Sequence, residues 1–333
     1  MKITFFEVRE KEQDFLAPPL QVHGLSFFKE KLDLETLNKA KDADIISVFI
    51  NSEVTKEIID ALPKLKLIAT RSTGFDHINI AYAKEKGIAV ATVPSYGTHA
   101  VAEFAFALIL DLSRKVSNAN RQIREEASFN ISNFQGFDLF EKTLGVVGTG
   151  KIGKNMVKIA KGFGMKVIAF DSFPDQKFAQ ENNFQYLPLN DVLVNSDIIT
   201  LHTPYNKDTH HLINKENIKL FKKGSYFINT ARGEIIDTEA LFFGLKEGII
   251  AGAGLDVLEG ERKLKEEVEF IAHGYSDVDN FKTLLEDHIL MEMPNVIVTP
   301  HIAFFSREAE MEILKITAEN ILAFNSGTQK NVL

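Results

Sequence analysis

The sequence predicts an α/β protein built from two doubly wound parallel-sheet domains. The chain has 333 residues, which at roughly 150 residues per domain indicates two domains. Short β-branched or aromatic runs alternate with segments of helical period, a pattern typical of parallel strands joined by helices. Several of these runs are apolar throughout, as expected where helices cover both faces of a sheet.

The individual elements follow from these two patterns in chain order. We expect strands at residues 2–6, 44–50, 66–70, 89–92, 143–147, 166–170, 197–202, 225–230, 250–256 and 296–299. We expect helices at residues 55–62, 152–162, 238–246 and 308–324, and a buried crossing helix in the apolar stretch 100–112. Residues 261–293 are charged and are predicted to be irregular. A first strand–helix series therefore ends near Pro94, and a second opens at Thr143.

Composition excludes several classes of protein. Hydrophobic residues make up 45% and charged residues 25% of the chain, which excludes a disordered chain. The 46 acidic residues outnumber the 38 basic ones, for a net charge of −8, and no basic stripe is present, so nucleic acid is not an expected partner. The chain has no cysteine, which removes disulfides, thiol nucleophiles and cysteine-ligated metals and fits a reducing cytoplasm.

Nothing in the sequence predicts membrane association. The first residues lack the apolar core of a signal peptide. The best uncharged apolar run, residues 104–110, stops at Asp111, well short of the roughly 18 residues that a membrane span needs. We therefore expect a cytoplasmic protein, and we expect no metal site.

The sharpest local signal is a glycine-rich turn between a predicted strand and a predicted helix. Gly148, Gly150 and Gly153 form G-x-G-x-x-G directly after the strand at 143–147. The first glycine permits a tight turn, the second lets the backbone approach a pyrophosphate, and the third lets helix and strand pack closely. The spacing alone is weak evidence, but its position between strand and helix predicts a Rossmann dinucleotide-binding domain.

A carboxylate follows at the position where dinucleotide-binding enzymes hold the adenosine ribose. Asp171 ends the next predicted strand, 18 residues beyond Gly153, and a carboxylate there accepts hydrogen bonds from the ribose hydroxyls. It also repels a 2′-phosphate, so NAD is favoured over NADP. The alternative is that Asp171 simply caps the turn that follows it.

Charged side chains follow three further predicted strands. Arg232 comes just past the strand at 225–230, three carboxylates including Glu261 follow the strand at 250–256, and His301 follows the strand at 296–299. The carboxyl ends of parallel strands line the ligand crevice of an open α/β sheet. Taken singly, each residue also fits a surface charge, a turn or a core position.

These motifs together resemble one enzyme family. G-T-G-x-I-G, N-T-A-R-G, L-D-V-x-x-x-E and T-P-H-I-A, in that order, resemble the D-isomer-specific 2-hydroxyacid dehydrogenases. Residues 71–78 resemble that family's carboxylate-binding loop, and residues 93–103 its interdomain hinge. The acidic segment after Glu261, the residues 300–305 and Tyr96 resemble the D-lactate dehydrogenase branch. His77 and the residues 97–99 depart from that branch near the expected substrate pocket.

The resemblance implies an architecture and a partner. It implies a Rossmann NAD domain, residues 99–299, inserted into a flavodoxin-like substrate domain made of residues 1–98 and 300–333. It also implies a homodimer that forms through residues 100–112. A core helix of a monomer is the alternative interpretation of that stretch.

The resemblance further implies the reaction pyruvate + NADH + H⁺ to D-lactate + NAD⁺, in either direction. His301 is then the proton donor or acceptor, a role that suits an imidazole near neutral pH. Glu261 fixes its tautomer, and Arg232 binds the carboxylate and carbonyl of the substrate. Backbone amides near Thr73 and Gly74, with the Tyr96 hydroxyl, hold the carboxylate. The implied NAD-binding residues are Gly148, Thr149, Gly150, Lys151, Ile152, Asp171, Thr203, Pro204, Thr230, Ala231 and Asp256.

Other functions remain open at this stage. The substrate pair could be another 2-oxo and 2-hydroxy acid, such as glyoxylate, hydroxypyruvate or a bulkier oxoacid. A co-repressor that senses NADH would share the fold and the Arg232, Glu261 and His301 set. A methyltransferase also uses a Rossmann fold, but nothing in its chemistry needs those three residues.

Overall fold

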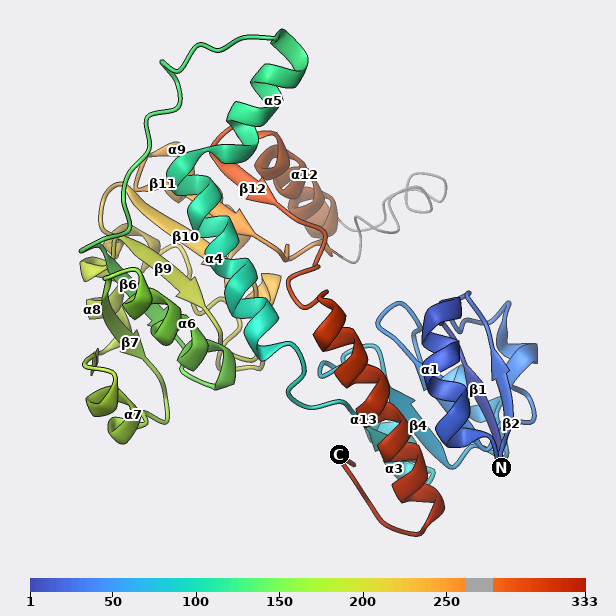
Figure 1. The fold of residues 1–333 in the computed structure, drawn as a ribbon. Coiled ribbons are helices and arrows are strands. Elements are labelled where there is room, and N and C mark those ends of the chain that lie inside the picture. Colours follow the sequence, from blue (N-terminus) through green and yellow to red (C-terminus); the bar gives the residue numbers. More distant parts are fainter. Residues whose placement is uncertain (262–277) are drawn as a thin grey trace. The chain divides into compact units, whose positions relative to one another are not determined.

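The computed structural model describes residues 1–261 and 278–333 of the chain (Figure 1). The chain divides into two compact units. Unit 1 comprises Met1–Gly97 and Phe305–Leu333, and unit 2 comprises Thr98–Phe304. Each unit is built on its own parallel sheet, so the predicted α/β class with two parallel sheets is confirmed.

Unit 1 contains a five-stranded sheet in the order β2-β1-β3-β4-β5, with every neighbouring pair parallel. This order is that of flavodoxin-like folds. Its strands are β1 (Lys2–Phe5), β2 (Gly24–Phe27), β3 (Ile45–Val48), β4 (Leu67–Thr70) and β5 (Ala89–Ala91). Its helices are α1 (Glu10–Leu20), α2 (Lys56–Asp60), α3 (Ile80–Glu85) and α13 (Arg307–Asn325).

Both faces of this sheet are buried. Ile45 and Ile46 are neighbours on β3 and each has no exposed surface, yet they belong to different apolar clusters. Successive side chains of a strand point to opposite faces, so helices must cover each face. The continuous apolar character of β3 and β4 has this cause.

Unit 2 contains a seven-stranded parallel sheet in the order β12-β11-β10-β9-β6-β7-β8. The strand order reverses direction at β6 and β9, which is the Rossmann arrangement with its switch point between those two strands. The strands are β6 (Thr143–Val147), β7 (Lys166–Phe170), β8 (Gln185–Tyr186), β9 (Ile198–Leu201), β10 (Ser225–Asn229), β11 (Ile250–Leu255) and β12 (Val296–Val298).

The helices of unit 2 cover its sheet on both faces. They are α4 (Thr98–Arg114), α6 (Lys151–Gly162), α7 (Gln176–Glu181), α8 (Leu189–Asn195), α9 (Thr238–Lys246) and α12 (Val278–Glu292). The helix α5 (Val116–Glu126) also belongs to unit 2 but has no buried residue. α4 packs against α6, β10 and β11 of its own unit (Figure 1). Its apolar stretch therefore lies largely in the core of unit 2, with Ala102 and Ala105 fully buried.

The prediction that residues 261–293 are irregular is wrong for their second half, which forms α12. Residues 262–277 lie outside the described part of the chain. Within α12, Leu290 and Asp287 are three residues apart and both are buried, so a carboxyl interrupts the apolar stripe that would have signalled a helix. The short edge strands β2 and β8 and the proline-containing α1 were not predicted either. In the described part of the chain, no helix combines the length and apolarity that crossing a membrane requires.

Candidate active site

The strands of unit 2 end level with one another, which brings their following loops to one edge of the sheet. Val147 of β6 pairs with Leu201 of β9, and Asn229 of β10 pairs with Leu201 on one side and Leu255 on the other. Leu255 in turn pairs with Val298 of β12. Phe170 of β7 pairs with Val147 on its other side. The unit 2 side chains singled out from the sequence all lie in the segments that follow these strand ends.

The glycine-rich turn has the geometry that its spacing predicts. Gly148 has a φ of +91°, and a Cβ there would lie 2.8 Å from the carbonyl carbon of His202. A Cβ on Gly153 would lie 2.0 Å from the carbonyl oxygen of Gly148. Only glycine fits at these two positions. A Cβ on Gly150, by contrast, would meet nothing within 4 Å, so space remains open at the N-terminus of α6, where a phosphate binds well.

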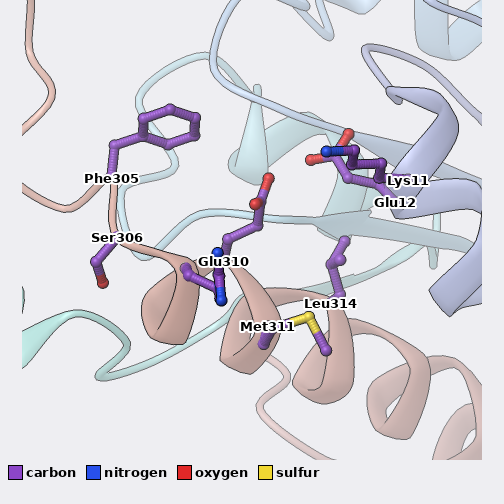
Figure 2. A pocket seen from close by; sticks show the side chains of 8 residues that line it. Lys11, Glu12, Phe305, Ser306, Glu310, Met311 and Leu314 are labelled. Atoms are coloured by element: carbon purple, nitrogen blue, oxygen red, sulfur yellow. The ribbon is translucent and has the colours of Figure 1, made fainter.

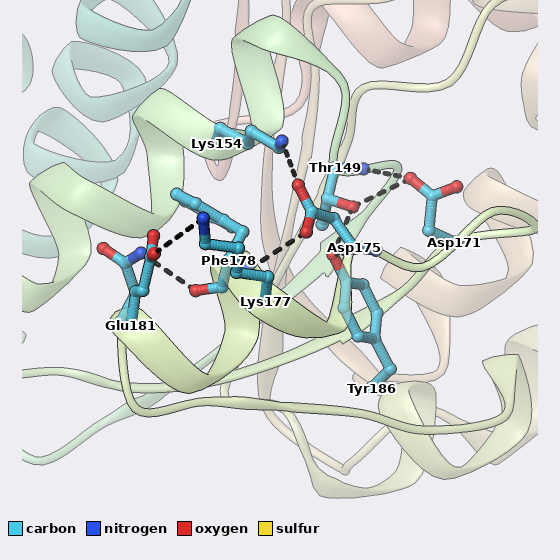
Figure 3. Close-up of polar contacts among 9 residues, drawn as sticks. Thr149, Lys154, Asp171, Asp175, Lys177, Phe178, Glu181 and Tyr186 are labelled. Carbon is cyan, nitrogen blue, oxygen red and sulfur yellow. Dashed lines mark hydrogen bonds and ion pairs between the residues drawn. The ribbon is translucent and has the colours of Figure 1, made fainter.

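Asp171 organises this turn from the neighbouring strand (Figure 3). Its Oδ2 accepts hydrogen bonds from the backbone N–H of Thr149 at 2.6 Å and from the Thr149 hydroxyl at 2.9 Å. Its Oδ1 accepts one from the backbone N–H of Phe173 at 2.8 Å, which is the turn-capping contact left as an alternative above. The carboxylate therefore caps its own turn and also holds the glycine-rich turn.

A second set of polar contacts supports the same region. The hydroxyls of Thr149 and Tyr186 lie 2.8 Å apart, and Lys154 of α6 forms an ion pair with Asp175 at 2.5 Å (Figure 3). The Asp175 side chain also accepts from the backbone N–H of Phe178 and caps α7. Its pKa is lowered, chiefly by the hydrogen bond from Lys154. Figure 3 shows these groups gathered on one side of the turn.

Two buried hydroxyls at the strand ends fit a bound dinucleotide. Within the described residues, the Oγ1 atoms of Thr203 and Thr230 are buried without a hydrogen-bond partner, which is costly unless a ligand or water supplies one. Together with the open space at Gly150, they fit the NAD expected here. Of the other residues implied to bind NAD, Lys151 and Pro204 are exposed, and Ile152 and Ala231 are half-buried.

The loop after β10 is shaped by Asn229. The Asn229 side chain donates to the carbonyl oxygen of Arg232 at 2.8 Å and accepts from the N–H of Ala231 at 3.0 Å. Arg232 is half-buried, and its Nη1 donates to the carbonyl oxygen of Ala231 at 2.7 Å. A Cβ on Gly233 would lie 2.1 Å from the carbonyl carbon of Leu258, so the Arg232 loop packs directly against the loop after β11.

Asp256 ties the loop after β11 to the loop after β12. Its carboxylate accepts from the Thr299 hydroxyl at 2.5 Å and from the backbone N–H groups of Ile302 at 3.0 Å and Ala303 at 2.8 Å. Burial raises the pKa of Asp256, although these hydrogen bonds act in the opposite direction. The residue is 1% exposed. The carboxylate thus holds the side chain of Thr299 before His301 and the backbone of the two residues after it.

His301 and Glu261 meet, as predicted. The Nδ1 atom of His301 lies 2.9 Å from Oε1 and 3.0 Å from Oε2 of Glu261, and both side chains are about a quarter exposed. His301 has a left-handed φ of +55°, and its N–H donates to the carbonyl oxygens of Asp256 and Thr299. In the described part of the chain, no hydrogen bond is made by Nε2 of His301. The imidazole is therefore held by one nitrogen.

Glu259, two residues before Glu261, points to a different place. Its carboxylate lies 2.6 Å from Nε2 of His211 and accepts from the hydroxyl of Thr238 at 2.7 Å. His211 also stacks on His210. Glu259 therefore anchors its loop to the start of α9 and does not join the His301–Glu261 pair.

The other residues expected to bind substrate belong to unit 1. Thr73 and Gly74 follow β4, and the Thr73 hydroxyl donates to the carbonyl oxygen of Val93 at 2.8 Å. The Ser72 hydroxyl donates to the carbonyl oxygen of Gly74 at 2.6 Å. Tyr96 is half-buried in the turn after β5. The turn that carries the two expected amides is therefore fixed by side chains of its own unit.

Unit 1 also holds a cavity of about 310 Å³ between the N-terminal turns of α1 and α13. Figure 2 shows Lys11 and Glu12 on one side and Phe305, Ser306, Glu310 and neighbouring residues of α13 on the other. Phe305, from the stretch 300–305 noted in the sequence, lines it, whereas none of the residues expected to bind NAD or substrate or to carry the catalysis does. The acidic and basic side chains present there are mixed, so the cavity does not indicate one ligand chemistry.

Sequence reasoning missed several residues that shape these loops. Asp287 stands inside a charged run and had no local signal, and Asn229 was noted only as the first residue of the N-T-A-R-G motif, without its role in shaping the loop. Arg71 is 2% exposed and donates to the carbonyl oxygens of Phe6 and Glu7 and to the Ser47 hydroxyl. Its burial lowers its pKa to about 10. A buried arginine just before Thr73 is recognisable only once its partners are known.

Comparison with known proteins gives a consistent result. Residues 106–303 match the family model described as D-isomer specific 2-hydroxyacid dehydrogenase, NAD binding domain. The glyoxylate reductase of Korarchaeum cryptofilum is 32% identical over 95% of this chain and 94% of that protein.

Two solved structures resemble the whole chain. The pyruvate reductase of Chlamydomonas reinhardtii has a TM-score of 0.88 and 34% identity and covers 98% of this chain and 97% of its own. The D-lactate dehydrogenase from Aquifex aeolicus, complexed with NAD and lactic acid, has a TM-score of 0.85 and 36% identity, with 98% and 96% covered.

Proposed function

Because the chain belongs to the D-isomer-specific 2-hydroxyacid dehydrogenase family, an NAD-dependent family of oxidoreductases that act on the CH–OH group, we propose that it interconverts pyruvate and D-lactate. The reaction is pyruvate + NADH + H⁺ to D-lactate + NAD⁺ and runs in both directions. Similarity over nearly the whole chain to a pyruvate reductase and to a D-lactate dehydrogenase bound to lactic acid supports this choice of substrate.

The observation that carries the proposal is the contact between His301 and Glu261. A carbonyl oxygen that receives negative charge during reduction needs a proton donor, and the reverse reaction needs a base. With Nδ1 held 2.9 Å from the Glu261 carboxylate, a proton on Nδ1 stays there and Nε2 faces the reaction. His301 is then the acid in reduction and the base in oxidation.

Arg232 supplies the positive charge for the substrate carboxylate and the polarised carbonyl. A guanidinium is always charged at physiological pH and can donate two parallel hydrogen bonds to a carboxylate. Its loop packs against the loop that leads to Glu261, through Gly233 and Leu258. That packing supports a role for both loops in one site.

The NAD-binding residues follow the edge of the unit 2 sheet. When bound, the nicotinamide cofactor supplies or accepts the hydride. We assign the pyrophosphate to the turn from Gly148 to Ile152, with its open N-terminus at Gly150, and the ribose hydroxyls to Asp171. The remainder of the dinucleotide is bordered by Thr203, Pro204, Thr230 and Ala231. We assign the nicotinamide carboxamide to Asp256.

For unit 1, we assign the amides of Thr73 and Gly74 and the hydroxyl of Tyr96 to the substrate carboxylate. Unit 1 then serves as the substrate domain and unit 2 as the NAD domain. The hydrogen bonds from Thr73 to Val93 and from Ser72 to Gly74 support this assignment, because they give the turn one conformation in advance of binding.

The proposal includes a cytoplasmic homodimer. Large apolar side chains on and after α5 are exposed, among them Val116 (62%), Phe129 (83%) and Ile131 (83%), and a dimer interface would remove such side chains from water. Sedimentation velocity at micromolar concentration would test the dimer, with a mass of 37.4 kDa expected for a monomer. Fractionation of cells that express the tagged chain would test the location.

A steady-state comparison of 2-oxoacids with NADH tests the choice of substrate. We expect kcat/KM for pyruvate to exceed that for glyoxylate, hydroxypyruvate and phenylpyruvate, and the product to be the D isomer. Glyoxylate is the second candidate, because a glyoxylate reductase is 32% identical over nearly the whole chain. A higher kcat/KM with glyoxylate would replace the first candidate by the second. Tight NADH binding without turnover of any oxoacid would instead support an NADH sensor.

A further inference from the structure

A buried carboxyl on α12 contacts the loop that carries Glu261. Asp287 has no exposed surface, and its Oδ2 accepts a hydrogen bond from the backbone N–H of Gly260 at 3.0 Å. Gly260 directly precedes Glu261, whose carboxylate holds Nδ1 of His301. Asp287 therefore lies one hydrogen bond and one peptide unit away from the acid–base pair of the proposed function.

The two residues before Gly260 are held as well, but by other partners. Leu258 packs its backbone against Gly233, so closely that a Cβ there would not fit. Glu259 contacts His211 and Thr238. Between these anchors and Glu261, the one hydrogen bond described for the Gly260 N–H is the bond to Asp287. Loss of this acceptor would leave a buried amide unpaired, which is costly enough to move the turn.

The burial of this carboxyl needs an explanation. Its Oδ1 is buried without a hydrogen-bond partner in the described part of the chain. Burial raises its pKa to about 7, with repulsion from Glu259 and Glu286 adding to the increase and the Gly260 N–H and His288 opposing it. An apolar side chain at this position would avoid these costs. What a carboxyl gains in return is the bond to Gly260.

We propose that Asp287 is a positioning residue for catalysis, which orients Glu261 toward His301 by accepting the hydrogen bond from the Gly260 amide. The inference rests on the proposed function. Asp287 touches neither substrate nor cofactor in this scheme. It acts through Glu261, so its loss affects the proton-transfer step more than the binding of NADH.

Three variants separate this role from general stability. Asp287→Leu removes the acceptor with similar volume. Asp287→Asn keeps an acceptor oxygen for Gly260. Leu290→Val is the matched control, because Leu290 is a buried residue of the same helix, 1% exposed, and belongs to an apolar core cluster of unit 2.

The measurements are kcat and KM for pyruvate, the single-turnover rate of NADH oxidation and the Kd for NADH. We expect Asp287→Leu to lower kcat and the single-turnover rate by about 10- to 100-fold, the range expected when a catalytic group is misplaced by about 1 Å. The Kd for NADH should stay within about twofold. Asp287→Asn should restore the rate to within about threefold of the native enzyme, and Leu290→Val should leave it unchanged. If Asp287→Leu does not fold, Asp287→Ala replaces it with the same expectation.

Two results would overturn the inference. One is a native single-turnover rate in the variants that lack the acceptor. The other is an equal loss of rate in Leu290→Val, which would make the effect a matter of stability. His301→Ala, measured alongside, distinguishes this failure from that of the proposed function. If His301→Ala keeps full activity, the acid–base assignment fails; if it is inactive while Asp287→Leu is normal, only the role of Asp287 fails.

Discussion

The buried carboxyl of Asp287 makes stability depend on pH in a way that one substitution should remove. Its pKa is raised from 3.8 to about 7 in the folded protein, mainly by burial. Well below pH 3.8 the carboxyl is protonated in both the folded and the unfolded chain, so its ionisation does not affect stability there. As the pH rises toward 7, the unfolded chain releases the proton and the folded protein keeps it, and the free energy of unfolding falls.

The size of this loss follows from the two pKa values. The interval from 3.8 to about 7 corresponds to about 4 kcal/mol, reached near pH 7 and constant above it. The side chain of Asp287→Asn cannot ionise, so the stability of this variant should not fall with pH for this reason. Its amide N–H groups would take the place of the unpaired Oδ1, at a pH-independent cost of about 1–3 kcal/mol.

Calorimetric unfolding of the native protein and of Asp287→Asn, at pH 4.5 and at pH 8.5, tests the reasoning. From pH 4.5 to pH 8.5, the free energy of unfolding of the variant should rise by about 3–4 kcal/mol relative to that of the native protein. For a domain the size of unit 2, this corresponds to a relative rise in melting temperature on the order of 10 °C. Leu290→Val should lower the free energy of unfolding by the same amount at both pH values. A difference between Asp287→Asn and the native protein that did not change with pH would refute the raised pKa.

Three further substitutions test the proposed site. Arg232→Ala should lower kcat/KM for pyruvate by about 10³-fold or more, because it removes a charge-assisted contact to the substrate; steady-state kinetics with near-normal turnover would refute its role. His301→Ala should nearly abolish reduction at neutral pH while NADH binding, followed by fluorescence titration, persists; a collapse of NADH affinity would make His301 a structural residue. Gly233→Ala should lower both the melting temperature and kcat, because its Cβ would lie 2.1 Å from the carbonyl carbon of Leu258; unchanged values of both would show that the two loops can separate freely.

The parts of the fold that were predictable from sequence are those with a local cause. The strands β3, β4, β6 and β9 are apolar runs because helices cover both sheet faces, and all were expected within two residues of their observed ends. The glycine-rich turn was recognisable because Gly148 and Gly153 occupy positions where a Cβ would collide with backbone. The edge strands β2 and β8 are short and mostly not fully buried, so they carried a weak pattern.

In the candidate site, too, the residues with a local sequence signal were predictable and those held by distant contacts were not. His301, Arg232 and Glu261 could be singled out because strand ends in a parallel sheet converge on one edge. Nothing local indicated that Asp256 holds the backbone around His301 through Ile302 and Ala303. The residues that hold the loops make contacts across tens of sequence positions, and such contacts leave no periodicity to detect.

By itself, the sequence determined the α/β class, the place of the dinucleotide turn and the identity of the charged groups at the strand ends. Each of these depends on residues close together along the chain, whose spacing is set by strand and helix geometry. The tertiary structure alone decided which carboxylate meets His301: Glu261 does, whereas Glu259 turns to His211. It also decided that α12 buries Asp287 against Gly260. Those outcomes depend on how separate loops pack, because a buried polar group takes whichever partner the assembled fold supplies.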